Sequence, residues 1–264
     1  MELSEARHLG DMTPDRPKLV TFGISHFCEK ARWALDWHGL PYDEISWPIG
    51  MHSLLAKRHG ARDTTVPILL AGKTVAQGSG DIIDWADRNG RGRGLTVPGA
   101  RDIELRADTV IGVHVRRLSY AEMLPSFSHL VRIELLRNLS TSQRLAANVM
   151  WPVTRRLMMR AMDITPSAAA ESGAILDEEL DWLDRLLADG RSHLAGETFS
   201  RADITVASLL APFARPKEMP IFHSMAISDA LVAYCERWGD RPAIGWVRAQ
   251  YQNHRVSNKR DAWC

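Results

Sequence analysis

Residues 18–42 read KLVTFGISHFCEKARWALDWHGLPY, a short apolar run followed by an amphipathic segment. The apolar run predicts a buried strand. Ser25 then stands where a helix cap is expected, and residues 27–38 form a good helical sequence. Gly39 ends that helix, and Pro41 prevents its continuation. This stretch therefore predicts a strand, a capped helix and a turn into a second strand.

The next segments extend this pattern into a small mixed sheet. The further elements predicted before residue 90 are a strand over 42–47, a short helix or turn over 51–58, strands over 65–70 and 74–77, and a helix over 81–88. The turn between the last two strands is tight and contains Gly72. Strand-helix-strand followed by strand-strand-helix is the order of a small sheet with helices on its faces. We therefore expect an α/β domain over residues 17–89.

A second domain of helices follows a linker over residues 90–100, which is rich in glycine and contains proline. The helices predicted after it cover residues 101–118 or slightly beyond, 127–139, 142–162, 168–188, 201–212, 228–238 and 242–253. Ser200 and Asp203 have capping-box spacing, which we interpret as the structural start of a core helix. We expect an all-helical domain over residues 101–254.

The composition excludes several classes of function. The formal net charge is +1, so neither nucleic acid nor a membrane surface is indicated as a partner. The sequence has no apolar run of membrane-spanning length, and the polar arm over residues 1–16 does not resemble a signal peptide. Three cysteines are too few for a disulfide framework, which favours the cytoplasm. The ten histidines show no metal-ligand spacing, so no metal is expected.

Ser25 and Cys28 lie at the start of the first predicted helix. Unpaired N–H groups and the positive end of the helix dipole stabilise an anion, such as a thiolate, at this place. The two residues have the spacing of a Cys-x-x-Cys redox pair whose first sulfur is replaced by oxygen. The alternative is that Ser25 only caps the helix and that Cys28 is a small buried apolar residue. This segment alone leaves both interpretations open.

A second candidate site lies at Val66 and Pro67. If the peptide bond before Pro67 is cis, the main-chain N–H and C=O of Val66 turn outward, unpaired by the sheet. Such groups can pair with the backbone of a bound peptide, as an added strand does. The alternative is a trans proline in an edge strand.

The turn over residues 77–81 is a third candidate site. Gly78, Ser79 and Gly80 are small, so their backbone N–H groups can form an anion-binding nest, to which the Ser79 hydroxyl adds a hydrogen bond. Asp81 can pair with an ammonium group. The ligand expected here carries both charges, as the end of an amino acid does. The alternative is a helix start that Ser79 caps.

Together, these segments are similar to the glutathione transferase superfamily over nearly the whole chain, from about residue 18 to 253. The strongest parts are residues 25–35 with 39–42, residues 65–70 with the following hairpin, and residues 194–196 running into 200–204. Their order and spacing are more specific than any one of them. The resemblance implies an α/β thioredoxin-like N-terminal domain that binds glutathione, an all-α C-terminal domain and a homodimer.

The resemblance also implies roles for individual residues. Ser25 matches the residue that hydrogen-bonds the glutathione sulfur and favours its thiolate. Val66 matches the residue whose main chain pairs with the cysteinyl part of glutathione, Pro67 the family's cis-proline, and Ser79 the serine that holds the γ-glutamyl carboxylate. The residues that we expect to bind glutathione are Phe27, Thr65, Val66, Pro67, Gln77, Gly78, Ser79 and Asp81, with Ser25 and Cys28 as catalytic candidates.

The implied activity is conjugation of the glutathione thiolate to an apolar electrophilic small molecule, with glutathione as co-substrate. The helical domain would supply the pocket for that second substrate. Candidate pocket residues are His114, Arg116, Tyr120, His129, Trp151 and Arg155, although residues of these types are more often core or surface.

Three departures from the family pattern motivate two alternative functions. His26 stands where proline is frequent, and Gly78 stands where Glu or Gln commonly precedes the serine, in a turn similar to that of glutaredoxins. The segment over residues 120–162 is longer than the family's. One alternative is a thiol transferase or reductase in which Cys28 forms a mixed disulfide with glutathione. The other is a ligand-binding module that keeps the fold without turnover.

Overall fold

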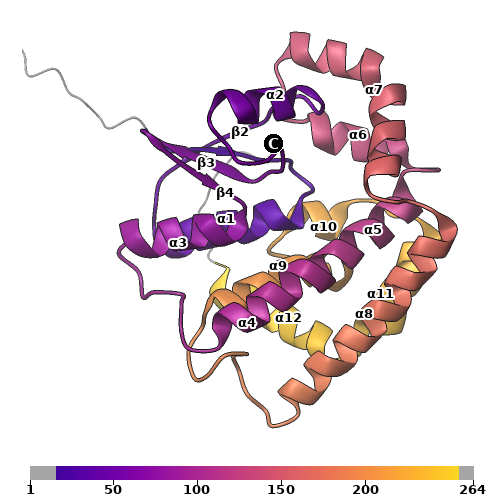
Figure 1. Ribbon diagram of the computed structural model, residues 1–264. Helices are drawn as coiled ribbons and strands as arrows, with labels where there is room; N and C mark the ends of the chain where they lie inside the picture. The colour runs from indigo at the N-terminus through magenta and orange to yellow at the C-terminus, as the bar shows by residue number, and fades with distance from the viewer. Residues whose placement is uncertain (1–15, 256–264) are drawn as a thin grey trace, which may run out of the picture.

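A four-stranded sheet forms the centre of the N-terminal domain in the computed structural model, which describes residues 16–255 (Figure 1). The strands are β1 (Lys18–Val20), β2 (Asp43–Ile45), β3 (Ile68–Ala71) and β4 (Thr74–Gln77), in the spatial order β2-β1-β3-β4. β1 pairs parallel with β2 and antiparallel with β3, which pairs antiparallel with β4. The predicted mixed sheet is confirmed. The polar arm expected over residues 1–16 lies, except for its last residue, outside the described range.

Three helices cover this sheet: α1 (His26–Trp37), α2 (Met51–Arg58) and α3 (Ser79–Asn89). Neighbouring residues of a strand point to opposite faces. Leu19 of β1 accordingly packs with α1 and α3 on one face, whereas Val20 packs with Ala56 of α2 on the other. α1 is therefore held between the sheet and the second domain, and its N-terminus faces the junction of the two domains.

The second domain is helical throughout. Its elements are α4 (Ala100–Arg106), the π-helical turn η1 (Ala107–Ile111), α5 (Gly112–Met123), α6 (Ser128–Leu136), α7 (Thr141–Ala161), α8 (Pro166–Leu187), α9 (Arg201–Ala214), α10 (Pro220–Ser224), α11 (Asp229–Gly239) and α12 (Pro242–His254). The central helix α9 is buried on nearly all sides and begins at the predicted capping box, in which the Ser200 N–H donates to Asp203 at 2.7 Å. The short helix α10 was not predicted, because five residues are too few to show a helical period.

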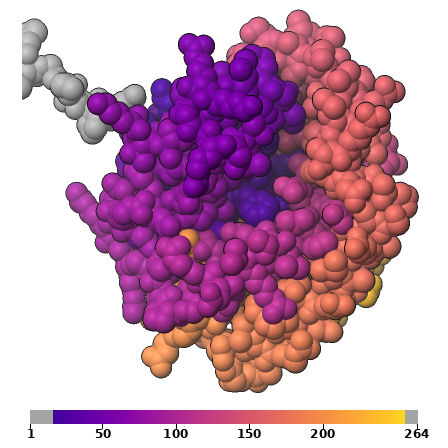
Figure 2. Space-filling model, viewed as in Figure 1, coloured from indigo at the N-terminus to yellow at the C-terminus, as the bar shows by residue number. Residues whose placement is uncertain are grey.

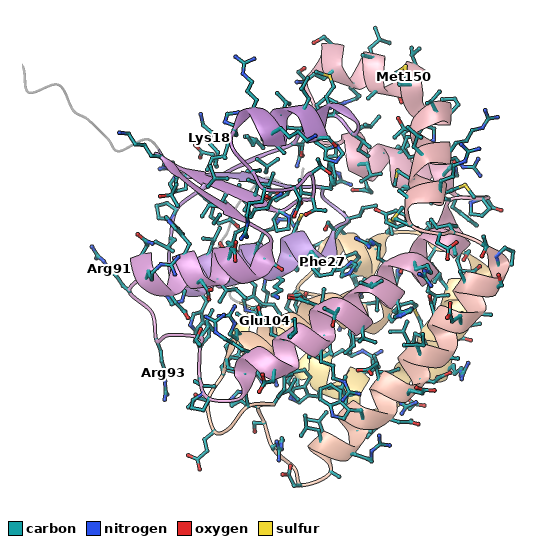
Figure 3. All side chains as sticks on the ribbon, viewed as in Figure 1. Lys18, Phe27, Arg91, Arg93, Glu104 and Met150 are labelled. Atoms are coloured by element: carbon teal, nitrogen blue, oxygen red, sulfur yellow. The ribbon has the colours of Figure 1, made fainter. Side chains whose placement is uncertain are left out.

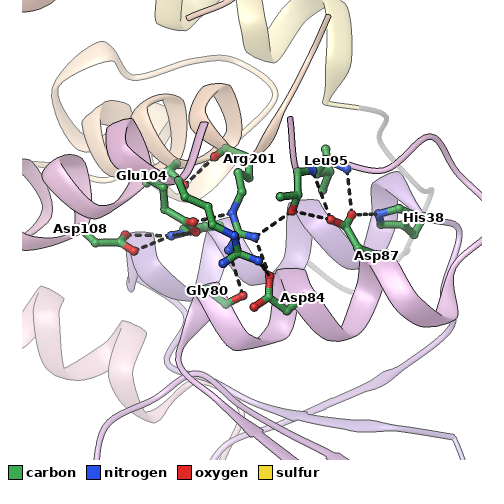
Figure 4. A network of polar contacts seen from close by, with 12 residues as sticks. His38, Gly80, Asp84, Asp87, Leu95, Glu104, Asp108 and Arg201 are labelled. Carbon is green, nitrogen blue, oxygen red and sulfur yellow. Dashed lines mark hydrogen bonds and ion pairs between the residues drawn. The ribbon is translucent and has the colours of Figure 1, made fainter. Parts of the chain in front are cut away.

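Buried charges join the two domains (Figure 4). Lys30 of α1 pairs with Glu104 of α4 at 2.8 Å, and Glu104 also pairs with Arg201 of α9. Arg201 reaches back into the first domain, where it pairs with Asp84 of α3 at 2.5 Å and donates to the carbonyl of Gly80 at 3.3 Å. The network therefore fixes α1 and the start of α3 against the helical domain.

Candidate functional site

A cavity of about 420 Å³ lies where the two domains meet. Ser25, Phe27, Thr65 and Val66 line it from the N-terminal domain, and mainly apolar side chains line it from the helical domain. Figure 2 shows the corresponding face hollowed between the purple N-terminal domain and the salmon helices, with indigo atoms of the early chain in the hollow. Four of the predicted site residues thus share one cavity.

Ser25 occupies the N-cap of α1 and faces this cavity. Its Oγ accepts a hydrogen bond from the Cys28 N–H at 3.3 Å, which leaves the hydroxyl proton available for donation. Within residues 16–255, no hydrogen bond from the N–H groups of His26 and Phe27 is found. The capping interpretation and the sulfur-binding interpretation of Ser25 are therefore compatible. A hydroxyl, free N–H groups and the helix dipole together suit an anion.

His26 and Phe27 hold the start of α1 against α5. The neutral His26 ring contacts the Gly112 carbonyl through Nε2 at 3.0 Å, and burial lowers its pKa to about 3. The Phe27 ring lies so close to Gly112 that a Cβ there would be 2.5 Å from Phe27 Cζ. This hydrogen bond between the domains gives His26 a role at the position where proline is frequent in the family, because a proline side chain has no donor for it. Figure 3 shows Phe27 at the junction of the domains.

The Val66–Pro67 peptide bond is cis, so the alternative of a trans edge-strand proline is wrong. No described residue makes a hydrogen bond to the main-chain N–H or C=O of Val66, which leaves both groups available for a ligand. The Gln77 amide supports this loop instead of reaching the cavity. It donates to the carbonyls of Asp63 at 2.8 Å and Thr65 at 3.2 Å and accepts from the Asp63 N–H at 2.9 Å.

The turn before α3 differs from the expected helix start. Gly78, with a φ of 85°, takes the N-cap position, and no side chain caps α3. The interpretation of Ser79 as the cap is therefore wrong, and the helix begins two residues earlier than predicted. The N–H groups of Ser79, Gly80 and Asp81 have no hydrogen-bond partner within residues 16–255, which suits a carboxylate. Asp81 pairs with Arg62 in an exposed ion pair.

The remaining predicted site residues lie outside the cavity lining. Pro67, Gln77, Gly78, Ser79 and Asp81 form the neighbouring loop and turn. Cys28, by contrast, is 0% exposed, in the first turn of α1. Burial raises the pKa of its thiol, and the opposing charge of Arg32 does not reverse this effect. Cys28 is therefore buried, although it keeps its contact with Ser25 one helical turn away.

The helical domain contributes residues that the sequence only partly indicated. Of the candidate pocket residues, Arg116 and Tyr120 line the cavity, whereas His114, His129, Trp151 and Arg155 are absent from its lining. Arg116, Ser119, Tyr120 and Met123 recur at helical spacing on one face of α5, a signal that could have selected them. The other lining residues, among them His52, Met158, Phe213, Arg215 and Cys235, had no such signal.

The long segment over residues 120–162 forms part of the cavity wall. α6 contributes Val131 and Leu135, and the last turn of α7 contributes Met158 and Ala161. Met150, near the middle of α7, lies on the outside of the molecule, 53% exposed (Figure 3). The segment therefore contributes apolar side chains to the cavity wall.

No group of three or more His, Cys, Asp or Glu side chains within residues 16–255 is placed to hold a metal ion. No helix of the same range has the length and apolar character required to cross a bilayer.

Two family models match the chain, one in each domain. Residues 19–94 match the family described as glutathione S-transferase, N-terminal domain, and residues 166–237 match glutathione S-transferase, C-terminal domain. No curated protein matches the chain in sequence.

Solved structures share the fold at low sequence identity. A glutathione S-transferase of Ceriporiopsis subvermispora in complex with glutathione is 15% identical, with a TM-score of 0.61 over 92% of this chain and 99% of that one. A glutathione S-transferase of Methylobacillus flagellatus KT with glutathione bound is 15% identical, with a TM-score of 0.56 over 90% and 95%. A beta-etherase of Sphingobium sp. strain SYK-6 is 19% identical, with a TM-score of 0.52 over 89% and 99%. With both domain matches in the expected order on this fold, the chain belongs to the glutathione transferase superfamily.

Proposed function

We propose that the protein is a glutathione transferase that conjugates the glutathione thiolate to an apolar electrophile. One observation carries this proposal: the Ser25 hydroxyl and the unpaired main chain of Val66 line the same cavity as the apolar side chains of the helical domain. The first two groups suit glutathione, and the apolar side chains suit a second substrate. Two of the similar structures hold glutathione, which supports this choice of ligand.

In this proposal, the free N–H groups at the start of α3 bind the γ-glutamyl carboxylate, and Val66 pairs with the cysteinyl main chain. The Ser25 hydroxyl donates to the sulfur. One charge-assisted hydrogen bond is worth about 1.5–3 kcal/mol, and one pKa unit corresponds to about 1.4 kcal/mol, so this bond suffices to favour the thiolate near neutral pH. The sulfur then forms a bond to the electrophilic carbon, and the leaving group departs with its bonding electron pair.

Ser25→Ala tests the proposal. We expect the pKa of the bound glutathione thiol, measured by ultraviolet titration of the thiolate, to rise by about 1–2 units. Turnover of 1-chloro-2,4-dinitrobenzene at pH 6.5 should fall about tenfold or more, and Ser25→Thr should restore part of it. Ser228→Ala is the matched control, because Ser228 also caps a helix but lies outside the cavity lining. Unchanged thiol pKa and turnover in Ser25→Ala would exclude this role.

The thiol-transferase alternative depends on Cys28, whose burial disfavours it. Incubation with oxidised glutathione followed by peptide mass spectrometry distinguishes the two activities. We expect no glutathione adduct on Cys28 in the folded protein, and an adduct there would favour thiol transfer. Calorimetry with glutathione, combined with turnover assays on a panel of electrophiles, distinguishes a transferase from a non-catalytic binding module. Binding of glutathione without turnover of any electrophile would support the module.

Two properties implied by the family are part of the same proposal. We expect a homodimer, which sedimentation of the purified protein would detect as twice the mass of the chain. We also expect the protein to act in the cytoplasm, since its glutathione chemistry requires a reducing compartment.

A further inference from the structure

The cavity is lined by two positive charges and no negative one. Of its described lining residues, Arg116 and Arg215 are cationic, and none is Asp or Glu. Arg215 is already engaged, because its Nη2 donates to the main-chain carbonyls of His223 at 2.7 Å and Met225 at 3.0 Å. Arg116 is therefore the charge that the fold leaves uncompensated in the described part of the cavity.

Arg116 has no counterion among residues 16–255. It makes no ion pair or hydrogen bond there, and its Nε is buried without a partner. Tyr120, Arg117 and His26 interact with it electrostatically, and burial lowers the pKa of its guanidinium. A partly buried cation without a partner still loses solvation, and a ligand of opposite charge offsets that loss.

The surroundings of Arg116 suit an anion that is attached to an apolar body. Ser119 and Tyr120 place hydroxyl groups on the same face of α5. Burial raises the pKa of Tyr120 to about 12, so its hydroxyl stays protonated and can donate a hydrogen bond. Met158, Phe213 and other apolar side chains line the rest of the wall. A guanidinium beside a hydroxyl donor is suited to bidentate binding of a carboxylate.

We propose that the second substrate carries an anionic group, a carboxylate or sulfonate on an apolar body, which Arg116 binds with the help of Tyr120. This inference rests on the proposed transferase function and names the substrate class of the same site. The carboxylates of glutathione itself are expected at the loop and turn around Val66 and Ser79, of which only Val66 reaches the cavity. In the reaction, the anionic group stays unchanged and only orients the electrophile.

A matched pair of electrophiles tests the proposal: 4-chloro-3-nitrobenzoate and its methyl ester. In both, the thiolate forms a C–S bond at the carbon that bears chlorine, and chloride leaves with the bonding pair. We expect Arg116→Gln to lower kcat/KM for the benzoate about 10- to 100-fold and to change that for the ester less than threefold. Arg116→Lys should restore part of the benzoate activity. Equal losses for both electrophiles would overturn the proposal.

Two controls separate other roles of Arg116. Arg117→Gln should leave both activities unchanged, because Arg117 pairs with Glu171 and is absent from the cavity lining. The KM for glutathione and the pKa of its bound thiol should be the same in Arg116→Gln as in the wild type. A raised thiol pKa together with slower turnover of the ester would show that Arg116 serves the thiolate, contrary to the proposal.

Binding without glutathione distinguishes failure of this inference from failure of the transferase function. We expect 8-anilino-1-naphthalenesulfonate to bind the wild type and to bind Arg116→Gln at least tenfold more weakly, as measured by fluorescence. Arg116-dependent binding in a protein without turnover would uphold the anion site and refute the transferase. Turnover of the ester, with dye and benzoate both insensitive to Arg116, would refute the anion site alone.

Discussion

Burial of the His26 side chain makes the free energy of unfolding depend on pH. Its ring is buried against the Gly112 carbonyl, and its pKa lies near 3 instead of its ordinary value of 6.5. Below pH 6.5 the unfolded chain takes up a proton that the folded protein does not. The free energy of unfolding therefore falls as the pH is lowered from 6.5 towards 3, because protonation of His26 stabilises only the unfolded chain. Above pH 6.5 this loss is absent.

His26→Gln removes this titration while keeping a side-chain donor for the Gly112 carbonyl. Between pH 7 and pH 5, the wild type should lose about 2 kcal/mol more of its free energy of unfolding than the variant, since each pKa unit corresponds to about 1.4 kcal/mol. Urea unfolding at the two pH values measures the difference. His129→Gln, at an exposed histidine, is the control. Parallel losses in wild type and His26→Gln would contradict the expectation.

Single residues also mark the limit of what the sequence predicts. Ser25 was identified from its place after a strand and before a helix, a local pattern that the structure reproduces. The complete burial of Cys28 depends on which neighbours pack around the start of α1, and the local sequence pattern does not show these neighbours. Gln77 was expected at the ligand, yet the loop around Asp63 uses its amide, a contact between residues that no sequence period connects.

At the scale of elements, the turn from η1 into α5 depends on a close approach. Gly112 faces Phe27 and Leu209, and a Cβ at this position would lie 2.5 Å from Phe27 Cζ and 3.1 Å from the Leu209 methyl groups. Because Phe27 also lines the cavity, the contact connects helix packing to the site. π-helical turns such as η1 are often found at functional sites, which fits this position.

Gly112→Ala should therefore destabilise the protein by about 1–3 kcal/mol, the usual cost of overpacking, and lower its activity by displacing the Phe27 ring. Gly245→Ala is the matched control: this glycine of α12 has open space at the Cβ position. Alanine has the higher helix propensity, so the control should gain up to about 1 kcal/mol. Thermal unfolding compares the two variants. If both changes have the same sign, the close contact does not determine the packing here.

At the scale of the whole molecule, the order of the two domains was predictable but the cavity was not. Strands and helices leave periodic patterns, so most elements were located within a few residues. The cavity brings together Val66, Met158 and Cys235, which belong to different domains or to distant helices. Their proximity follows from how the helical domain packs on α1, which no local pattern encodes.

Arg201 connects the two domains, so its substitution tests how they are held together. It is 1% exposed and pairs with Glu104 and Asp84, and so joins the helical domain to α3. Arg201→Met should cost about 3–5 kcal/mol, because it leaves the buried Glu104 carboxylate with less compensating charge. Affinity for glutathione should fall as well, since Arg201 also holds the Gly80 carbonyl in the turn before α3. Chemical denaturation and calorimetry measure the two effects.

Two further variants show whether the effect comes from an uncompensated charge between the domains. Arg241→Met breaks two partly exposed pairs, with Asp181 and Asp184, inside the helical domain and should cost about 1 kcal/mol or less. Adding Glu104→Gln to Arg201→Met should recover part of the lost stability, because it removes the buried charge that has lost a partner. If Arg201→Met and Arg241→Met cost the same, and Glu104→Gln recovers nothing, apolar packing alone holds the two domains together.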